Sequence, residues 1–331
     1  MNQFELSRAS SVADALALLA GDSQARFIAG GTNLLDLMKE DVARPTRLID
    51  ITHLPLAAVE AGKEGGLRIG ALVSNADLAY HGEVESRYPL LSQAILAGAS
   101  PQLRNMASTG GNLLQRTRCY YFYDAAMPCN KREPGSGCPA REGVNRIHAI
   151  LGASEQCVAV HPSDMCVALA ALDATVHVSG PAGDRAIQFD HFHQLPGDTP
   201  DIDTSLAQDE IITAVELPAE GYSSHYSYIK VRDRASYAFA LVSVAAGLVL
   251  DGETIGSAAV ALGGVAHKPW RDRQAEQLLI GKPANEASFT AFADALLQPA
   301  QPLAHNAFKI GLAKRTIVRA LSRAVAMEKQ S

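Results

Sequence analysis

The chain has 331 residues, of which 47% are hydrophobic and 19% charged, and its formal net charge is −6. This length allows two or three domains with a sizeable core. The negative charge argues against a broad basic face for nucleic acid. No stretch approaches the ~18 continuous apolar residues that a membrane-spanning helix needs.

The N-terminal part of the sequence predicts a compact α/β unit. Ser10 or Ser11 can cap an amphipathic helix, and Asp14 stands at the capping-box position. This start lacks the basic n-region of a signal peptide, so we expect no export signal on this chain and, for the chain alone, a cytoplasmic location. A buried strand at 26–29 then leads through a Gly-Gly pair into a helix at 34–39, and a strand returns at 48–51.

A strand, a Gly-Gly pair and a helix N-terminus in this order can present free backbone N–H groups to a phosphate. A tight turn without any ligand is the simpler alternative, because neither the dinucleotide fingerprint nor the P-loop motif is present.

In the middle of the chain the sequence predicts a strand at 67–71 and a core helix at 88–99. Residues 102–112, QLRNMASTGGN, break this periodicity and predict a polar loop that suits either a ligand's polar tail or a satisfied turn. Further along, Ser163 and Asp164 cap a helix at 165–172, and strands follow at 175–178 and 211–217.

Four of the five cysteines lie in a segment rich in Pro, Gly, Asn and Arg, which favours a loop. Their spacing, C-x9-C-x8-C-x18-C, matches neither a zinc finger nor a small ferredoxin. A 4Fe-4S cluster tolerates irregular spacing, and nearby arginines and lysines would offset its negative charge. We therefore favour a cluster, with zinc and unligated thiols as alternatives. The fifth cysteine, Cys166, lies on an apolar helix and is expected to fill the core.

The C-terminal part predicts an α+β domain. A domain boundary is expected at 217–224, strands at 225–231, 237–250 and 257–265, and helices at 272–279, 285–297 and 303–329. The last helix carries Lys309, Lys314, Arg315, Arg319 and Arg323, which we expect to form a solvated face rather than a docking site.

Several motifs together resemble the FAD-binding subunit of molybdenum hydroxylases, the family of xanthine dehydrogenase and carbon monoxide dehydrogenase. They occur in the family's order: AGGTNLLDLM (29–38), IGA (69–71), QLRNMASTGGN (102–112), PSDM (162–165) and YIKVRDRASYAFALVSVAA (228–246). The resemblance implies an α+β fold with a two-part FAD-binding domain over 1–220, divided at about residue 54. It also implies a 4Fe-4S insertion at about 113–160, and a C-terminal domain over 221–331 with a three-stranded antiparallel sheet and a helical bundle.

The resemblance also implies cofactor contacts. The backbone of the Gly-Gly turn would hold the FAD pyrophosphate, the TGGN segment would lie against flavin and ribityl, and two charged side chains would bind polar parts of FAD. The implied residues are Ala29, Gly30, Gly31, Thr32, Asn33 and Leu34, then Thr109, Gly111 and Asn112, and finally Asp164 and Lys230.

Most members of the family run from TGGN to the PSD segment without a cysteine-rich insertion. Two subgroups carry a 4Fe-4S cluster there, namely periplasmic-type aldehyde oxidoreductase and 4-hydroxybenzoyl-CoA reductase. The segments RTRCYYFYD and PCNKREPGSGC are more similar to the former. The implied cluster ligands are Cys119, Cys129, Cys138 and Cys157.

This likeness implies a heterotrimer. A large partner with the molybdenum cofactor would oxidise an aldehyde to a carboxylic acid, and a small partner with 2Fe-2S clusters would pass electrons to FAD on this chain and on to an external acceptor. Export alongside a signal-bearing partner would place the complex in the periplasm. No catalytic base is needed on this chain, so its histidines are expected to be structural. The alternatives are the flavin subunit of a 4-hydroxybenzoyl-CoA reductase-like or xanthine dehydrogenase-like enzyme and, from another class, a zinc-stapled scaffold.

Overall fold

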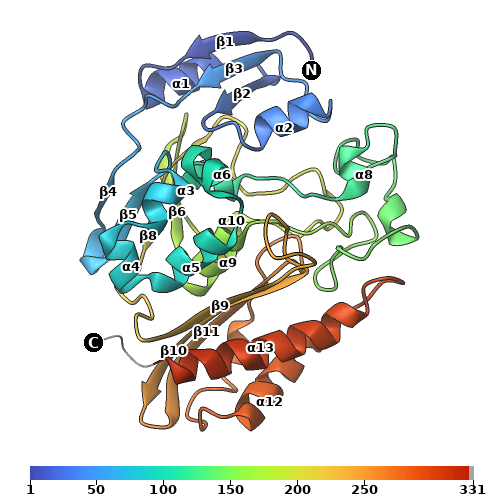
Figure 1. Ribbon diagram of the computed structural model, residues 1–331. Helices are drawn as coiled ribbons and strands as arrows, with labels where there is room; N and C mark the ends of the chain where they lie inside the picture. Colours follow the sequence, from blue (N-terminus) through green and yellow to red (C-terminus); the bar gives the residue numbers. More distant parts are fainter. Residues whose placement is uncertain (328–331) are drawn as a thin grey trace.

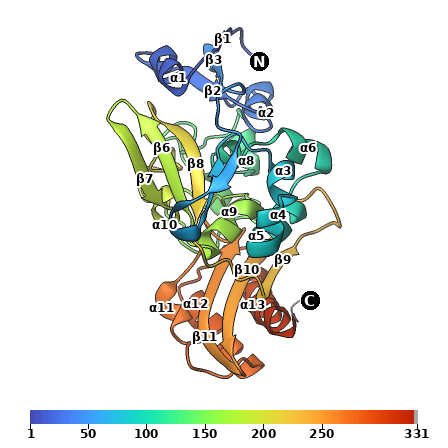
Figure 2. The same ribbon diagram turned by 90° about the vertical axis from the view of Figure 1, so that its left-hand side faces the viewer.

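A computed structural model describes residues 1–327 and arranges them in three units stacked end to end, each built on its own sheet (Figures 1 and 2). The chain is a mixture of helices and strands, as the sequence predicted. None of the described helices is both long and apolar enough to cross a membrane.

The N-terminal unit is a small parallel sheet in the order β1-β3-β2 with two helices. Its elements are β1 (Glu5–Arg8), α1 (Val12–Leu19), β2 (Ala25–Ile28), α2 (Leu34–Lys39) and β3 (Arg47–Asp50). The predicted cap of α1 is confirmed, because the Ser11 hydroxyl accepts a hydrogen bond from the Asp14 backbone N–H at 3.0 Å. The Asp14 carboxylate in turn accepts from the Ser10 N–H at 2.8 Å.

The middle unit is an antiparallel five-stranded sheet in the order β4-β5-β8-β6-β7, and short helices cover one of its faces. Its strands are β4 (Val59–Ala61), β5 (Leu67–Gly70), β6 (Thr175–Gly180), β7 (Gly183–Gln188) and β8 (Ile211–Leu217). Its helices are α3 (Asn75–Ala79), α4 (Gly82–Arg87), α5 (Pro89–Ala97), α6 (Pro101–Met106), α7 (Thr109–Leu113), α9 (Asp164–Ala171) and α10 (Phe189–Phe192). A 3-10 turn, η1 (Lys63–Gly65), precedes β5.

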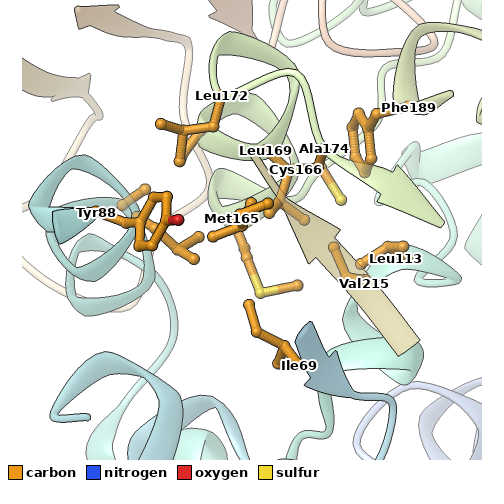
Figure 3. Close-up of a cluster of buried hydrophobic side chains, with 14 of the residues drawn as sticks. Ile69, Tyr88, Leu113, Met165, Cys166, Leu169, Leu172, Ala174, Phe189 and Val215 are labelled. Atoms are coloured by element: carbon orange, nitrogen blue, oxygen red, sulfur yellow. The ribbon is translucent and has the colours of Figure 1, made fainter. Parts of the chain in front are cut away.

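The core of this unit forms where α5 and α9 pack over the sheet (Figure 3). Tyr88, Met165, Leu169 and Val215 are at most 1% exposed there. Cys166 has no exposed surface and belongs to the same cluster, as predicted. Helix α9 is therefore buried nearly all round, which fixes the position of its first residue, Asp164.

The C-terminal unit is an antiparallel sheet in the order β11-β10-β9 with helices packed on one face, which confirms the predicted architecture. Its elements are β9 (His225–Val231), β10 (Val242–Asp251), β11 (Thr254–Gly263), α11 (Arg273–Glu276), α12 (Glu286–Leu297) and α13 (Phe308–Ala326).

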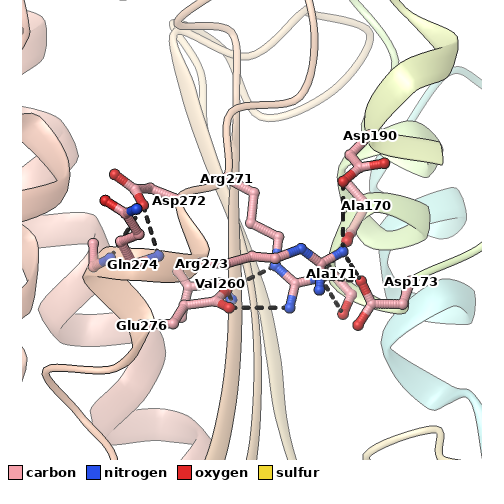
Figure 4. Close-up of polar contacts among 11 residues, drawn as sticks. Ala170, Ala171, Asp173, Asp190, Val260, Arg271, Asp272, Arg273, Gln274 and Glu276 are labelled. Atoms are coloured by element: carbon pink, nitrogen blue, oxygen red, sulfur yellow. Dashed lines mark hydrogen bonds and ion pairs between the residues drawn. The ribbon is translucent and has the colours of Figure 1, made fainter. Parts of the chain in front are cut away.

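A buried arginine joins the C-terminal unit to the middle unit (Figure 4). Arg271 donates to the Asp173 carboxylate at 2.7 Å, to the carbonyl of Ala170 at 2.7 Å and to the Glu276 carboxylate at 2.8 Å. Glu276 also accepts from the backbone N–H of Val260 in β11. The guanidinium can be buried at this interface because acceptors from both the middle and the C-terminal units pair with its N–H groups.

Residues between α7 and α9 form the cysteine-rich segment, shown in green in Figure 1 between the N-terminal and C-terminal units. It is mostly irregular, as predicted, with only a short helix α8 (Tyr120–Tyr123) and a 3-10 turn η2 (Pro139–Arg141). The Tyr123 hydroxyl donates to Asp36 of α2 at 2.9 Å. At the other end, Asn145 accepts from the His305 backbone N–H at 2.9 Å, so the segment is anchored to both neighbouring units.

Several sequence predictions were wrong. Residues 102–112 are not a loop but contribute most of α6 and α7, because Ser100 and Ser108 cap these helices. The strand expected at 237–250 begins only at Val242, and strands β4 and β7 were missed. The last helix begins at Phe308 rather than at residue 303, and its predicted end at Lys329 lies outside the described residues.

Lys309 is also a correction. The basic residues of this helix predict a solvated face, yet Lys309 has no exposed surface. Its ammonium donates to the carbonyls of Gly264 at 2.6 Å and His148 at 2.8 Å. Those two acceptors lie far from Lys309 in the sequence, so the periodicity of the helix gave no indication of them.

Candidate functional site

A cavity of about 730 Å³ opens where the three units meet, and all three contribute to its walls. Six of the eleven residues expected to contact a cofactor line it. They are Thr32 and Asn33 before α2, Gly111 and Asn112 in α7, Asp164 at the start of α9 and Lys230 in β9.

The Gly-Gly turn brings the N-terminal unit close to the middle unit. A Cβ on Gly30 would lie 1.6 Å from the carbonyl oxygen of Met106, and Gly31 has a φ of +70°, so both positions require glycine. Ala29, Gly30, Gly31 and Leu34 do not line the cavity themselves. The turn lies behind the cavity wall, and the two residues that follow it, Thr32 and Asn33, line the cavity.

Asn33 lines the cavity, and one of its two side-chain polar atoms has no protein partner. Its Oδ1 accepts a hydrogen bond from the backbone N–H of Arg116 at 2.9 Å. Its Nδ2 is buried and has no partner among the described residues. The same is true of Asn75 Oδ1 and Ser243 Oγ, which also belong to residues lining the cavity. Ser243 also lies within hydrogen-bond reach of Tyr228. Buried polar atoms are rarely left without a partner, so the amides of Asn33 and Asn75 are the groups of this wall that can gain a partner when a polar ligand binds.

Helix α7 presents a bare backbone to the cavity. A Cβ on Gly110 would press on Ala71 at 3.1 Å, whereas one on Gly111 would meet only the Ser108 hydroxyl. Asn112 accepts from the Ser163 hydroxyl at 2.5 Å, which joins the TGGN segment to the start of α9. Thr109 is 1% exposed, donates to the carbonyl of Val73 at 3.0 Å and does not line the cavity.

The two charged residues predicted from sequence lie side by side. The Lys230 ammonium contacts the Asp164 carboxylate at 2.7 Å, and their side chains are 5% and 8% exposed. The Tyr228 hydroxyl donates to the other carboxylate oxygen at 2.6 Å. Burial and the Asp164 charge raise the pKa of Tyr228 well above its usual range, so this phenol stays a donor.

Sequence reasoning missed Tyr228, Asn75 and Ser243. Tyr228 stands two residues before Lys230 in a strand, so both side chains point to one face, and this periodicity could have indicated it. Asn75 and Ser243 had no comparable signal, because only the tertiary structure brings α3 and β10 to the same cavity.

The four predicted cysteine ligands come together around a second, much smaller cavity. They form a separate cluster with Phe122, Ala140, Val158 and Leu37 of α2. None is in a disulfide; Cys119, Cys129 and Cys157 are buried and Cys138 is half-buried. The structure thus brings together all four thiols that the sequence analysis singled out.

The thiols influence one another. Burial raises the pKa of Cys119 to about 11. A hydrogen bond from Cys157 lowers the pKa of Cys138 to about 6, and the same contact raises the pKa of Cys157. The thiolate is the form that ligates a metal, so Cys138 is the sulfur of this site that most readily supplies it.

A buried lysine also lines the cysteine cavity. Lys131 is 3% exposed and donates to Asp203 at 2.6 Å and to the carbonyl of Pro200 at 2.6 Å. Burial would raise the pKa of Asp203, but the charges of Arg116 and Lys131 lower it to about 2. Arg116 completes this network at 2.7 Å from Asp203. One of these cations, Lys131, is therefore held on the wall of the cysteine cavity, near Cys157.

The cavity and the cysteine cluster share one wall. Arg118 and Tyr120 line the large cavity, whereas Thr117, Cys119 and Tyr121 line the cysteine cavity. Successive residues of a single segment thus face the two sites alternately.

Of the histidines expected to be structural, His148 and His193 are buried, whereas His53 and His191 are exposed. His148 lies with its Nε2 3.1 Å from the Cys119 sulfur. The rings of His161 and His193 have centroids 4.3 Å apart and are tilted by 55°, and burial lowers the pKa of both. Together with Cys166 they are the only set of three or more potential metal ligands within residues 1–327 whose ligand atoms all lie within 4.8 Å of one another.

The chain matches two family models over nearly its whole length. Residues 2–220 match the FAD binding domain in molybdopterin dehydrogenase, and residues 226–324 match the CO dehydrogenase flavoprotein C-terminal domain.

Individual relatives agree with these matches. The chain is 53% identical, over 98% of its length and 99% of the relative, to the aldehyde oxidoreductase FAD-binding subunit PaoB of Escherichia coli. It is 30% identical to the glyceraldehyde dehydrogenase medium chain of Sulfolobus acidocaldarius, over 86% of this chain and 83% of that one. Among solved structures, a chain of carbon monoxide dehydrogenase from Hydrogenophaga pseudoflava superimposes with a TM-score of 0.77 at 26% identity, covering 98% of both chains.

Proposed function

The chain belongs to the FAD-binding subunits of the molybdenum hydroxylases, and on this premise we propose that it is the FAD- and 4Fe-4S-containing electron-transfer subunit of a heterotrimeric molybdenum-dependent aldehyde oxidoreductase. A large partner subunit would oxidise the aldehyde to a carboxylic acid at the molybdenum cofactor. A small partner with 2Fe-2S clusters would deliver the electrons to this chain, which would pass them to an external acceptor.

The residues of the large cavity suit FAD. All three units line the cavity. Its wall includes Asn33, whose Nδ2 has no protein partner, the Ser243 side chain beside Tyr228, and the bare backbone of Gly111. Bound FAD supplies the capacity to accept and release electrons one or two at a time. The chain's own contribution is to bind and orient the cofactor and to keep a buried ion pair, Asp164 and Lys230, beside it.

The residues of the cysteine cavity suit a 4Fe-4S cluster better than zinc. Zinc–sulfur bonds of about 2.3 Å require four sulfur atoms roughly 3.8 Å apart. In the part of the chain that the structure describes, no set containing three of these four cysteines has its sulfur atoms within 4.8 Å of one another. Cys138 and Cys157 are in hydrogen-bond contact, but the four sulfurs as a set are spread more widely than a zinc site requires, which matches a larger group. Lys131, which lines the same cavity, supplies positive charge for its negative sulfurs.

The observation that carries the proposal is the wall shared by the two sites. Cys119 faces the cysteine cavity, and its neighbours Arg118 and Tyr120 face the large cavity. Two redox groups in these positions would be separated by little more than one stretch of backbone, an arrangement suited to electron transfer between them. A zinc scaffold gives no reason for this proximity.

The aldehyde as substrate class is supported by the relative that is 53% identical, which is the FAD-binding subunit of an aldehyde oxidoreductase. A periplasmic site of action, reached by export with a signal-bearing partner, rests on the resemblance to periplasmic-type enzymes. Co-expression with the partners tests it: removing the partner's signal should retain this chain in the cytoplasm, and a chain that still reaches the periplasm would contradict co-export.

The cofactor content of the purified full chain is the primary test. Expressed in a strain competent in cluster assembly, it should contain about one FAD and about four iron atoms, with flavin absorption above a broad iron–sulfur background. A colourless protein with about one zinc would contradict the proposal and favour the scaffold.

The assembled complex tests the reaction. With an artificial electron acceptor it should oxidise aromatic aldehydes, and it should not act on 4-hydroxybenzoyl-CoA. Activity on the thioester alone would assign the chain to a reductase of the other cluster-containing subgroup.

A further inference from the structure

We propose that His148 donates a hydrogen bond from Nε2–H to the sulfur of Cys119 and thereby raises the reduction potential of the 4Fe-4S cluster. This inference rests on the proposed function, because it assumes that the four cysteines hold a cluster. Nothing in the cysteine spacing indicates it, since His148 lies between the third and fourth cysteines and was expected to be merely structural.

The geometry supports a direct contact. The Nε2 atom of His148 lies 3.1 Å from the Cys119 sulfur, and the ring is 1% exposed. Within the described part of the chain, no other histidine nitrogen is hydrogen-bonded to one of the four cysteine sulfurs. The contact is therefore specific to one corner of the proposed cluster.

The direction of the hydrogen bond follows from the chemistry of the ligand. A thiolate that ligates iron carries no proton, so its sulfur can only accept. Nε2 must then carry the hydrogen, because a nitrogen lone pair facing the sulfur would be repelled by it. The other ring nitrogen, Nδ1, makes no hydrogen bond to the protein, although the Asn145 carbonyl lies near the ring, so the negative sulfur at 3.1 Å decides the tautomer in favour of Nε2–H.

The C-terminal unit holds His148 in place. Its carbonyl oxygen accepts from the Lys309 ammonium at 2.8 Å and from the Asn306 amide at 3.2 Å. The rings of Tyr120 and Tyr121 flank the imidazole, each with its centroid 6.4 Å away. These contacts, none of which involves the cluster, hold the donor, so His148 is a positioning residue with a rigid support.

The effect on the cluster is electrostatic. Reduction adds one electron, for example from dithionite, and takes the cluster from its 2+ to its 1+ charge. The partial positive charge of an N–H beside a ligand sulfur stabilises the more negative state more than the oxidised one, and a dry site enlarges this difference. Loss of the donor should therefore make the cluster harder to reduce.

Potentiometric titration of the purified full chain, followed by electron paramagnetic resonance, tests this. In His148→Leu the midpoint potential of the cluster should become more negative by about 59 mV. For one electron, this shift corresponds to a tenfold change in the reduction equilibrium. His148→Gln, which can still donate, should lie between this variant and the wild type. His267→Leu, which replaces another buried histidine without a cysteine contact, is the matched control and should not shift the midpoint.

Iron content separates the possible failures. A wild-type chain without iron would refute the proposed function itself. A His148→Leu chain with about four iron atoms and an unchanged midpoint would overturn only the role of His148. Loss of iron from both His148 variants would also overturn it, because the histidine would then be required to hold the cluster.

A second measurement needs no variant. Wild-type chain labelled with ¹⁵N-histidine should show one weak nitrogen coupling to the reduced cluster in pulsed resonance experiments. A strong coupling would mean that Nε2 ligates iron directly, and no coupling would mean that the contact is absent; either result contradicts the proposal.

Discussion

The carboxylate of Asp164 and the ammonium of Lys230 form an ion pair at 2.7 Å, buried beside the large cavity. Asp164 is the first residue of α9, and Lys230 is the sixth residue of β9. The pair therefore joins the middle unit to the C-terminal unit at the cavity itself. Because both side chains are buried, water does not solvate either charge, and each charge is stabilised by the other.

Replacing one member of this pair should lower the free energy of unfolding more than replacing both. Lys230→Met leaves the buried Asp164 charge uncompensated, so we expect a loss of about 3–5 kcal/mol in the free energy of unfolding and weaker FAD retention. Asp164→Asn combined with Lys230→Met should recover part of that loss, because no bare charge remains. Unfolding midpoints and bound FAD measure both effects, with Lys282→Met as an exposed control. A double variant as unstable as the sum of the singles would argue against the pair.

The free amide of Asn33 can be tested without disturbing its other contact. In Asn33→Asp the side chain still accepts from the Arg116 N–H, but it loses the unpaired donor and gains a negative charge. If the turn holds the FAD pyrophosphate, affinity for FAD should fall at least tenfold, equivalent to about 1.4 kcal/mol. Fluorescence titration of the apo chain measures it. The same substitution at the exposed helix cap, Asn285→Asp, is the control and should leave FAD binding unchanged.

The cysteines differ in their expected roles. Cys129→Ser should abolish the cluster while FAD binding is at least partly retained, because the two cavities are separate. Cys166→Ser should keep its iron, since this sulfur lies in the hydrophobic core of the middle unit. Iron and flavin determination on both variants decides the matter. Full iron content in Cys129→Ser would remove that residue from the ligand set.

Lys309 should make stability depend on alkaline pH. Burial lowers its pKa to about 7 from the ordinary 10.5. Below pH 7 both states hold the proton, and the cost of the buried charge is fully present. Between pH 7 and 10.5 the unfolded chain binds more protons than the folded one, so this cost diminishes as pH rises.

Wild-type stability should therefore increase relative to Lys309→Met as the pH rises from 7 to 10. Thermal midpoints of both chains at several pH values measure the difference. Lys314→Met, on the more exposed side of the same helix, provides the comparison and should show no such trend. A constant difference between wild type and Lys309→Met would mean that Lys309 keeps its proton throughout this range.

The sequence by itself determined the local elements and the main motifs. Strand, glycine pair and helix at residues 25–39, the three C-terminal strands and the four loop cysteines all follow from short-range patterns: period, capping residues and turn residues. Asp164 and Lys230 were implied as cofactor contacts only by the resemblance of their segments to the family, not by these patterns. The patterns could not indicate that the two are each other's partners, since 66 positions separate them.

Tertiary structure alone decided which groups meet. The capped helices α6 and α7 appear in a stretch whose composition suggested a loop, because packing on the middle sheet overrides weak propensity. Lys309 is buried because carbonyls of two distant loops surround its ammonium. His148 reaches Cys119 because the C-terminal unit fixes its backbone. Contacts of this kind depend on long-range geometry, which residue spacing along the chain does not encode.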